Sequence, residues 1–234
     1  MARYTESDQG KERDRNEDYV YSFKLVDVFG LVVADGLGGH NAGHVASETA
    51  ARAFGESFQQ LNSGDLDEEA VRLSFEDAED AVHRKMGENP DEFEGMGTTL
   101  VTAVIKDGKV LVGNVGDSRA YLIRGDEIRQ VTEDHIEKQH HGMAGHLRTS
   151  TYLYNVIGGQ DNDIQVDVFE LELSPDNVLL LCTDGLTDEL SDSRIQRVVS
   201  KADSVNDAGR NLVKYANRSG GSDNISVALF SPPS

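Results

Sequence analysis

The sequence predicts an α+β fold in which helices cover antiparallel β-sheets. Two long amphipathic segments with helical spacing precede a series of short apolar strands, and a second pair of helices precedes one last strand. Short strands joined by Asp-Gly or Gly-Asp turns favour antiparallel pairing, because parallel strands need a crossover of a dozen or more residues. Helices that are segregated from antiparallel strands in this way are typical of the α+β class.

The first half of the chain is predicted to hold two strands and two helices. Residues 18–25 are rich in Val, Tyr and Phe, and residues 29–34 form an almost continuous apolar run, so both are predicted as strands. Asn41 can cap a helix in which apolar residues recur at helical spacing up to Leu61. Asp67 is predicted to open a second helix, because acidic residues in its first turn complement the macrodipole.

The second half is predicted to be mostly strands. The turns at Asp107-Gly108 and Gly125-Asp126 have the residue types of β-hairpins. Residues 133–159 lack periodicity and are rich in His, Gly and Thr, which predicts a mobile loop or lid. The predicted strands cover residues 98–105, 110–115, 119–123, 128–131, 164–173, 178–182 and 225–230, with helices near residues 193–200 and 205–217.

Composition restricts the class of protein and its partners. With 234 residues, the chain is expected to form one domain with a substantial core. The 42 acidic and 22 basic residues give a net charge of -20, which repels nucleic acid and anionic lipid and attracts multivalent cations; adaptation to high salt is an alternative origin of this acidity. The single cysteine, Cys182, lies in an apolar run and is interpreted as core. No apolar stretch approaches a membrane span, so we expect a soluble, cytoplasmic protein.

Two apolar strands lead directly into an aspartate. Asp35 follows one in VVADGLG and Asp184 follows another in LLCTDGLT. A hairpin turn is the alternative, but a glycine loop or a helix, rather than a returning strand, follows each. If the strand ends converge, the carboxylates raise each other's pKa, and divalent cations resolve that conflict. Ligation by oxygen alone favours Mn2+ or Mg2+ over zinc. Further acidic residues at predicted strand ends are Asp117, Asp223, Glu17 and Asp18.

Other residue types near these carboxylates suit the hydrolysis of a phosphate ester, which needs a nucleophile, charge neutralisation and an acid. Gly36 lets a backbone carbonyl turn inward, and two metal ions can share a carboxylate and a water of lowered pKa. Arg13 can hold two phosphoryl oxygens, with Arg15 as the weaker candidate and a solvated surface arginine as the alternative. His40 lies five residues after Asp35 and can protonate a leaving oxygen, although a helix cap or plain exposure is the alternative.

Seven segments resemble, in order, the motifs of the metal-dependent protein phosphatases, the PPM or type 2C family, in their compact bacterial and archaeal form. The segments are RDRNED (13–18), VADGLGGHNAGHVAS (33–47), GMGTTLV (95–101), VGNVGDSRAYLIR (112–124), VTEDH (131–135), LLLCTDGLTD (179–188) and GGSDNISV (220–227). The resemblance implies an α-β-β-α sandwich of two antiparallel sheets flanked by helix pairs. It also implies a single catalytic domain over residues 1–234, with a flap at about 133–160 and a binuclear Mn2+/Mg2+ centre.

The resemblance further implies a role for each matched residue. Arg13 would bind the substrate phosphate, His40 would be the general acid, and Asn224 and Thr183 would support the ligands. The implied metal ligands are Asp35, bridging both ions; Gly36, through its carbonyl; Asp184 and Asp223, on one ion; Glu17 and Asp18, supporting the other partly through waters; and Asp117, which with Asp184 matches a weaker third position.

Some residues depart from the family pattern or have no implied role. The family often has DHS where this chain has Asp134-His135-Ile136, and the flap that follows is shortened, which leaves substrate choice open. Thr98 and Thr99 are interpreted as packing residues. Three histidines could mimic a metal cluster but are interpreted as flap residues; these are His140, His141 and His146.

The resulting hypothesis is a cytoplasmic signalling phosphatase, specific for phosphoserine and phosphothreonine in proteins. Attack by a water or hydroxide that bridges the two ions would proceed without a covalent enzyme intermediate. We expect a monomer that opposes a Ser/Thr kinase and has no nucleic-acid or membrane partner. The alternatives are a two-metal phosphoesterase acting on small esters, nucleotides or diesters, and a catalytically weak sensor that binds phosphoproteins. A dinucleotide site and an EF-hand are excluded, because GLGGHN lacks the GxGxxG spacing and neither Asp-rich stretch has the EF-hand ligand positions.

Overall fold

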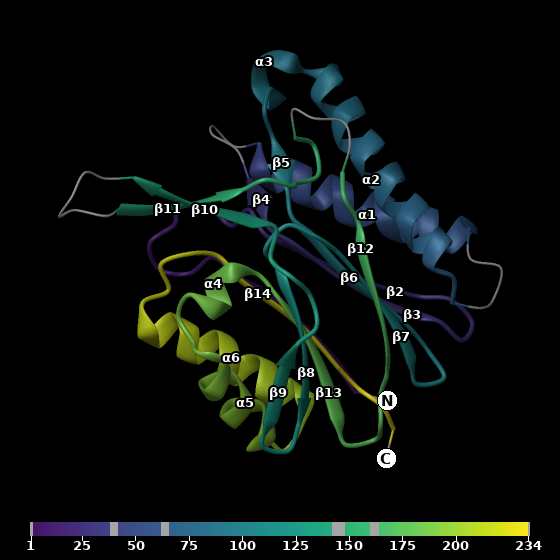
Figure 1. The fold of residues 1–234 in the computed structure, drawn as a ribbon, viewed down its shortest axis with the longest axis vertical. Coiled ribbons are helices and arrows are strands. Elements are labelled where there is room, and N and C mark those ends of the chain that lie inside the picture. The colour runs from purple at the N-terminus through teal and green to yellow at the C-terminus, as the bar shows by residue number, and fades with distance from the viewer. Residues whose placement is uncertain (1, 38–41, 62–65, 142–147, 160–163, 234) are drawn as a thin grey trace.

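The computed structural model describes residues 2–37, 42–61, 66–141, 148–159 and 164–233. Two five-stranded antiparallel sheets form its centre (Figure 1). The strands are β1 (Ala2–Asp8), β2 (Tyr19–Lys24), β3 (Phe29–Ala34), β4 (Gly36–Leu37), β5 (Gly97–Thr98), β6 (Leu100–Lys106), β7 (Lys109–Val115), β8 (Arg119–Arg124), β9 (Glu127–Gln130), β10 (Ile136–His141), β11 (Arg148–Leu153), β12 (Asp167–Glu172), β13 (Asn177–Cys182) and β14 (Ile225–Ser231). The helices are α1 (Gly43–Leu61), α2 (Glu68–Glu88), α3 (Pro90–Phe93), α4 (Asp184–Thr187), α5 (Asp192–Ser200) and α6 (Val205–Ser219).

The two sheets lie face to face, and a helix pair covers the outer face of each. One sheet has the order β1-β14-β13-β8-β9 and the other the order β12-β7-β6-β3-β2. In Figure 1, α1 and α2 lie on one side of the strands and α5 and α6 on the other. This arrangement confirms the predicted sandwich of two antiparallel sheets flanked by helix pairs.

The alternation of side chains along each strand produces three layers of core. On β3, Leu31 and Val33 pack between the sheets, whereas Val32 packs against α1 and α2. On β13, Leu179 packs between the sheets and Leu180 packs against α5 and α6. Both faces of β3 and of β13 are therefore buried, which explains why the sequences of these two strands are continuous apolar runs. Cys182 is fully buried in the layer beneath α5 and α6, as predicted.

The hairpin between β6 and β7 confirms the Asp-Gly turn. Asp107 has φ 50° and Gly108 has φ 83°. Both residues thus have positive φ, which Asp and Gly tolerate best and which matches the twist of a two-residue hairpin.

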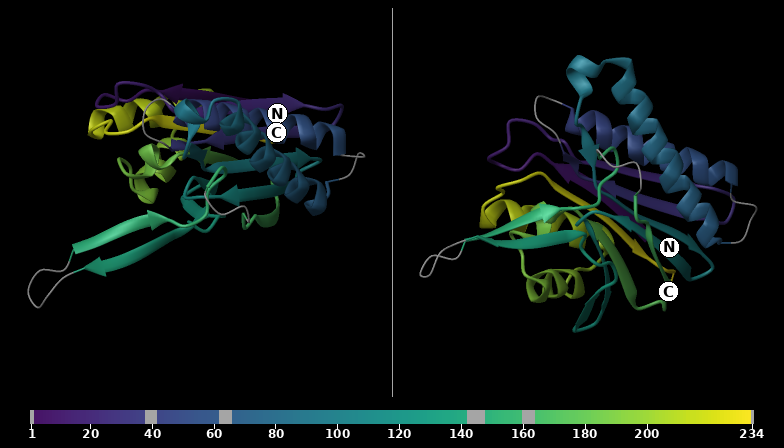
Figure 2. Two further views of the ribbon diagram at one scale, coloured as in Figure 1. Left: turned by 90° about the horizontal axis from the view of Figure 1, so that it is seen from above. Right: turned by 45° about the horizontal axis from the view of Figure 1, so that its top comes forward.

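The structure corrects three predictions made from periodicity. β1 was not predicted, because its sequence is polar, yet it pairs along its whole length with β14 at the edge of the sheet. Residues 133–159 were predicted to form a loop but contain the β10–β11 hairpin, which projects from the body of the molecule (Figure 2). The predicted strand at residues 98–105 is divided at Thr99 into β5 and β6. The first two errors concern segments that are mostly polar in sequence, so their backbone pairing gives no apolar periodicity.

Phe75 on α2 tests the packing of the helix pair. Its side chain is fully buried and meets Phe54 of α1 edge to face, with the ring centroids 5.2 Å apart. We expect Phe75→Ala to lower the free energy of unfolding by about 3–5 kcal/mol, because it leaves a cavity between α1, α2 and the sheet. Urea denaturation followed by circular dichroism measures this loss. The control is Leu73→Ala on the same helix, which is 36% exposed and should cost much less; equal losses would contradict the assigned packing.

Candidate metal centre

The ends of strands from both sheets bring the predicted carboxylates together. Asp35 follows β3, Asp184 opens α4 just after β13, and Asp223 precedes β14. The pKa of Asp35 lies well above its usual value, first because of burial and then because of the charges of four other aspartates. These four are Asp18, Asp184, Asp223 and Asp117. Residues far apart in the sequence therefore form one carboxylate cluster, which includes five of the predicted metal-ligand side chains.

Two of these carboxylates each keep one buried oxygen without a hydrogen-bond partner, namely Oδ1 of Asp18 and Oδ1 of Asp184. Burial raises the pKa of Asp18 to about 7; hydrogen bonds from Ser226 and Thr183 oppose this rise, and the charges of Asp184 and Asp223 add to it. A buried acceptor that forms no hydrogen bond costs free energy of about 1–3 kcal/mol. A hard cation would satisfy both oxygens and relieve the repulsion, so the donor set fits Mn2+ or Mg2+.

Gly36 is held where a side chain cannot fit. A Cβ atom at this position would lie 2.2 Å from the carbonyl oxygen of Gly43 and 2.6 Å from that of Glu17. The amide of Gly36 donates to the carbonyl of Glu17 over 3.2 Å. The start of α1, the residue after Asp35 and the segment before β2 are therefore in direct contact, which places Glu17 beside the carboxylate cluster.

Arg13 lies at the edge of this cluster. Its Nη2 atom is 2.6 Å from Oδ2 of Asp223, and the side chains of Arg13 and Asp223 are 51% and 27% exposed. Partial burial acts to lower the pKa of Arg13, but the charges of Asp223, Asp35 and Asp184 outweigh it and the pKa is raised. The structure therefore places Arg13 at the site, rather than as an isolated surface arginine. Arg15 instead contributes its backbone carbonyl, which accepts from Asn224.

Asn224 and Thr183 hold the N-terminal segment against β13 and β14. Nδ2 of Asn224 donates to the carbonyls of Gln9 and Arg15 over 2.8 and 2.9 Å, and its Oδ1 accepts from the amide of Glu17 over 2.8 Å. The hydroxyl of Thr183 donates to Oδ2 of Asp18 over 2.9 Å and accepts from the amide of Ser226. Both residues thus make the supporting contacts expected from the resemblance.

Thr98 and Thr99 do more than the packing predicted for them. Oγ1 of Thr99 accepts from the amide of Asp35 over 3.0 Å, and Oγ1 of Thr98 donates to the carbonyl of Asp35 over 2.8 Å. Oγ1 of Thr99 also forms a 2.7 Å hydrogen bond with Oγ of Ser118, next to Asp117. One buried hydroxyl therefore joins the two segments that carry Asp35 and Asp117. Sequence alone gave no signal for this link, because it depends on which strand end passes beside Thr99.

A cavity of about 420 Å³ adjoins the cluster. The carboxylates of Asp117 and Asp184 lie on its wall, and burial together with the charge of Asp184 raises the pKa of Asp117 to about 7. Lys138 and Leu153 from the β10–β11 hairpin line the other side. The cavity therefore connects the carboxylate cluster with the base of the hairpin.

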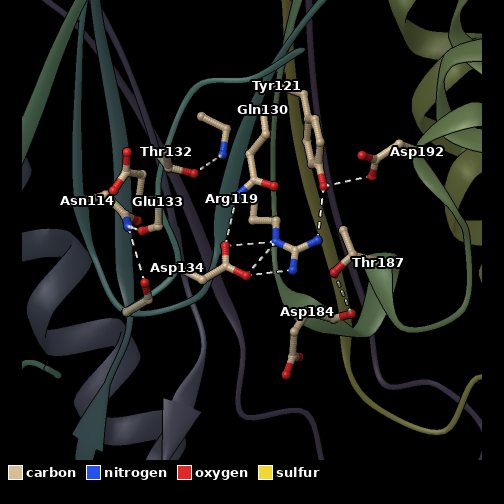
Figure 3. A network of polar contacts seen from close by, with 12 residues as sticks. Asn114, Arg119, Tyr121, Gln130, Thr132, Glu133, Asp134, Asp184, Thr187 and Asp192 are labelled. Carbon is tan, nitrogen blue, oxygen red and sulfur yellow. Dashed lines mark hydrogen bonds and ion pairs between the residues drawn. The ribbon is translucent and has the colours of Figure 1, made fainter. Parts of the chain in front are cut away.

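An arginine network stabilises the wall of this cavity (Figure 3). Arg119 donates to both carboxylate oxygens of Asp134, with the shortest contact at 2.6 Å, and its Nη1 donates to the hydroxyl of Tyr121. Tyr121 donates in turn to Asp192 at the start of α5. Because the carboxylate of Asp134 forms an ion pair with Arg119, the network holds the cavity wall in place without adding an unpaired carboxylate to it.

His135, which lies in the part of the chain that departs from the family pattern, fastens the base of the hairpin. The side chain is buried, and Nδ1 accepts from the amide of Gly116 over 3.1 Å and from Nδ2 of Asn155 over 2.7 Å. Nε2 must then carry the proton and donate to Oδ2 of Asp167 over 3.0 Å. His135 therefore ties both ends of the β10–β11 segment to β7 and β12.

Some predicted positions lie outside the described part of the chain. His40 and His146 are not described by the structure. The side chains of His140 and His141 are likewise not described. Among the described residues, no three His, Cys, Asp or Glu side chains form a complete set of metal ligands. In the described structure the carboxylates of the cluster therefore do not by themselves form a metal-holding group, and Asp223 is paired with Arg13.

Comparison with known proteins identifies the family. Residues 9–227 match the family model described as "Protein phosphatase 2C". The chain is 33% identical to the serine/threonine phosphatase stp of Listeria innocua, covering 95% of this chain and 92% of that protein, and 36% identical to the protein phosphatase PhpP of Streptococcus pneumoniae, covering 96% and 95%. The solved structure of the Mycobacterium tuberculosis serine/threonine phosphatase PstP/Ppp superposes with a TM-score of 0.84 at 27% identity, covering 100% and 99% of the two chains.

The two-sheet sandwich flanked by helix pairs matches the architecture of solved serine/threonine phosphatases, and the sequence comparisons indicate the same class of enzyme. The chain belongs to the protein phosphatase 2C family. This confirms the resemblance drawn from the seven sequence segments and the prediction of an enzyme that is a protein phosphatase.

The raised pKa values predict how the stability of the metal-free protein depends on pH. Asp18 has a folded pKa of about 7, against about 3.9 when unfolded, so between these values the folded state binds more protons than the unfolded state. The free energy of unfolding in EDTA should therefore fall as pH rises from about 4 to 7, by up to about 1.4 kcal/mol per pH unit for each such group. Urea titrations at successive pH values measure this slope.

Two comparisons separate the cluster from the general acidity of the chain. The slope should be shallower in Asp18→Asn, which removes one of the repelling charges, and shallower in excess Mn2+. A slope unchanged by both would show that the repulsion arises elsewhere on the surface.

Thr99→Val tests whether the threonine hydroxyl positions Asp35. The change keeps the shape of the side chain but removes the hydrogen bonds to the amide of Asp35 and to Ser118. Loss of an outer support of this kind should weaken Mn2+ binding about tenfold or more, measured by isothermal titration calorimetry. The matched control is Thr102→Val, because Oγ1 of Thr102 is buried without a partner; this change should leave Mn2+ affinity unaltered. Equal Mn2+ affinities in the Thr99→Val and Thr102→Val variants would contradict a role for Thr99 in positioning Asp35.

Proposed function

We propose that this chain hydrolyses phosphoserine and phosphothreonine in phosphoproteins with the help of two Mn2+ or Mg2+ ions. The observation that carries the proposal is the partly buried carboxylate cluster around Asp35, in which Asp18 and Asp184 each keep a buried oxygen without a partner. A protein of this charge gains nothing from such a cluster unless cations bind to it. Family membership and the names of the serine/threonine phosphatase relatives support the substrate class.

The residues would divide the task as the family resemblance implies. Asp35 would contact both ions and Gly36 would contribute its carbonyl. The remaining proposed ligands are Asp184 and Asp223 on one ion, Glu17 and Asp18 on the other, and Asp117 with Asp184 at a weaker third position. When bound, the ions would supply positive charge for the phosphoryl oxygens and lower the pKa of the attacking water.

The other groups would bind the phosphate and move the proton. Arg13 would exchange its contact with Asp223 for the phosphoryl oxygens, which its exposed position at the edge of the cluster permits. His40 would protonate the departing alkoxide. Thr98, Thr99, Thr183 and Asn224 would hold the backbone and carboxylates in place.

The cellular location, the oligomeric state and the partners of the enzyme form part of the same proposal. We place it in the cytoplasm as a monomeric catalytic domain over residues 1–234 that opposes a Ser/Thr kinase in signalling. Among the described residues, no helix is both long and apolar enough to cross a bilayer. The net charge of -20 argues against nucleic acid and anionic membranes as partners.

The decisive experiment measures phosphate release from a phosphothreonine peptide with Mn2+, after EDTA, and in Asp35→Asn. Activity should require Mn2+ and should fall at least about a hundredfold in the variant, since an electrostatic contact at the reacting centre is lost. The control is Asp176→Asn, which removes an exposed carboxylate paired with Arg124 and should leave activity unchanged.

The same assay separates the alternatives. Turnover of a phosphodiester or a nucleotide in preference to the phosphopeptide would favour a small-ester phosphoesterase. Binding of the phosphopeptide without phosphate release would favour a sensor. Activity without added metal, or full activity in Asp35→Asn, would contradict the proposed mechanism.

A further inference from the structure

A groove between α5 and α6 carries basic side chains on an otherwise acidic molecule. Its volume is about 570 Å³, and Arg194, Arg197 and Lys201 of α5 line it together with Tyr215 of α6. Among the described residues that line it, none is Asp or Glu. In Figure 1 the two helices lie on the side of the sandwich opposite α1 and α2.

The local charge contrasts with that of the whole chain. Residues 192–218 contain six basic and three acidic residues, a net charge of +3, whereas the complete chain carries -20. Asp192, the acidic residue nearest to Arg194 in the sequence, receives a hydrogen bond from Tyr121 on the sheet side of α5. The groove is therefore a positively charged region on a protein whose net charge is negative.

The basic groups in the groove are available to a ligand. Arg194 donates to the hydroxyl of Ser219 over 3.0 Å and lies 5.8 Å from the centre of the Tyr215 ring, so it is held in place without an ion pair. Arg197 and Lys201 are exposed and have no ion-pair partner among the described residues. The part-buried side chains of Val198 and Tyr215 supply apolar surface between them.

The groove lies close to the candidate metal centre along the chain. Ser191 lines the groove, and Asp188, three residues earlier, lines the cavity beside the carboxylate cluster. Three residues span at most about 11 Å, even when fully extended. The cations from Arg194 to Lys201 then extend about 10 Å further along α5. A short extended peptide can therefore reach from one site to the other.

We propose that this groove docks an acidic stretch of the protein substrate, several residues away from the phosphorylated residue that is hydrolysed. The proposal rests on the proposed function, because it names the kind of phosphoprotein that the enzyme prefers. Carboxylates of the substrate would pair with Arg197 and Lys201, while its aliphatic stems would contact Val198 and Tyr215. Nucleic acid and membranes fit less well, because the net charge of -20 on the whole chain repels extended polyanions.

Synthetic phosphothreonine peptides test this docking. One peptide carries a tail of four Glu residues after a six-residue neutral linker, a second carries the tail before the phosphothreonine, and a third carries Gln in place of Glu. At saturating Mn2+ and low salt, one Glu tail should raise kcat/KM about tenfold over the Gln peptide, which corresponds to about 1.4 kcal/mol. The gain should appear in KM and should decrease as salt is added.

A charge-reversal variant identifies the groove as the origin of the gain. Arg197→Glu with Lys201→Glu should remove the preference for the Glu tail and leave the hydrolysis of p-nitrophenyl phosphate unchanged. The matched control, Lys24→Glu with Arg84→Glu, alters the net charge equally at exposed positions elsewhere and should keep most of the preference. A third arm with phosphoserines replacing Glu in the tail, read as binding to a metal-free Asp35→Asn protein, shows whether phosphate serves as well as carboxylate.

The outcomes separate this proposal from the proposed function. Turnover of all peptides with no preference for a Glu tail, or a preference lost equally in both double variants, would overturn the docking groove alone. A protein that hydrolyses no phosphopeptide in Mn2+ would instead contradict the proposed function. Retained p-nitrophenyl phosphate activity shows that the double variants are folded.

Discussion

The repulsion among partly buried carboxylates is the constraint on which the rest of the structure depends. Asp35 comes from one sheet and Asp184 and Asp223 come from the other, so the cluster closes one end of the sandwich. Burial and mutual repulsion both oppose ionisation there. A fold keeps such an arrangement only where the surrounding structure is stable enough to offset it, and the three layers of apolar core supply that stability. Binding of the proposed cations would offset free energy that the cluster costs.

Hydrogen bonds from neutral side chains fix the positions of these charges. Thr98 and Thr99 satisfy the backbone of Asp35, Thr183 donates to Asp18, and Asn224 joins the segment before β2 to the start of β14. None of these groups adds charge to the cluster. Neutral supports are physically reasonable here, because a cationic support would compete with a bound metal for the carboxylates; the Arg13–Asp223 ion pair lies at the edge of the cluster.

The parts of the structure that the sequence predicted are those with a local cause. The Asp-Gly turn at Asp107 follows from the φ values that these residues tolerate, and the continuous apolar runs follow from burial on both strand faces. The convergence of Asp35 and Asp184 followed from an unusual feature, a buried strand that ends in a carboxylate. Asp18, Asp117 and Asp223 were included because they also stand at predicted strand ends, and the motifs in the family order then implied a ligand role for each.

The parts that could not be predicted depend on distant partners. β1 and the segments of the β10–β11 hairpin are mostly polar in sequence, so their pairing leaves little periodic signal. The contact of Arg13 with Asp223 joins residues 210 positions apart, and spacing alone left a solvated surface arginine as an equal alternative. The assignment of His40 stays a prediction, since that residue lies outside the described part of the chain.

The charge of the whole molecule raises a problem that the local structure answers. A phosphoprotein is anionic, and a chain with a net charge of -20 repels it before any contact forms. The proposed cations at the carboxylate cluster, together with Arg13 at its edge, would reverse the sign of the charge at the reacting phosphate. The basic groove of α5 and α6 reverses it on a neighbouring surface, where the rest of a substrate would lie. If both proposals hold, we expect an acidic phosphatase of this kind to bind anionic substrates selectively, through the groove and the metal centre, because the net charge of the rest of the chain repels them.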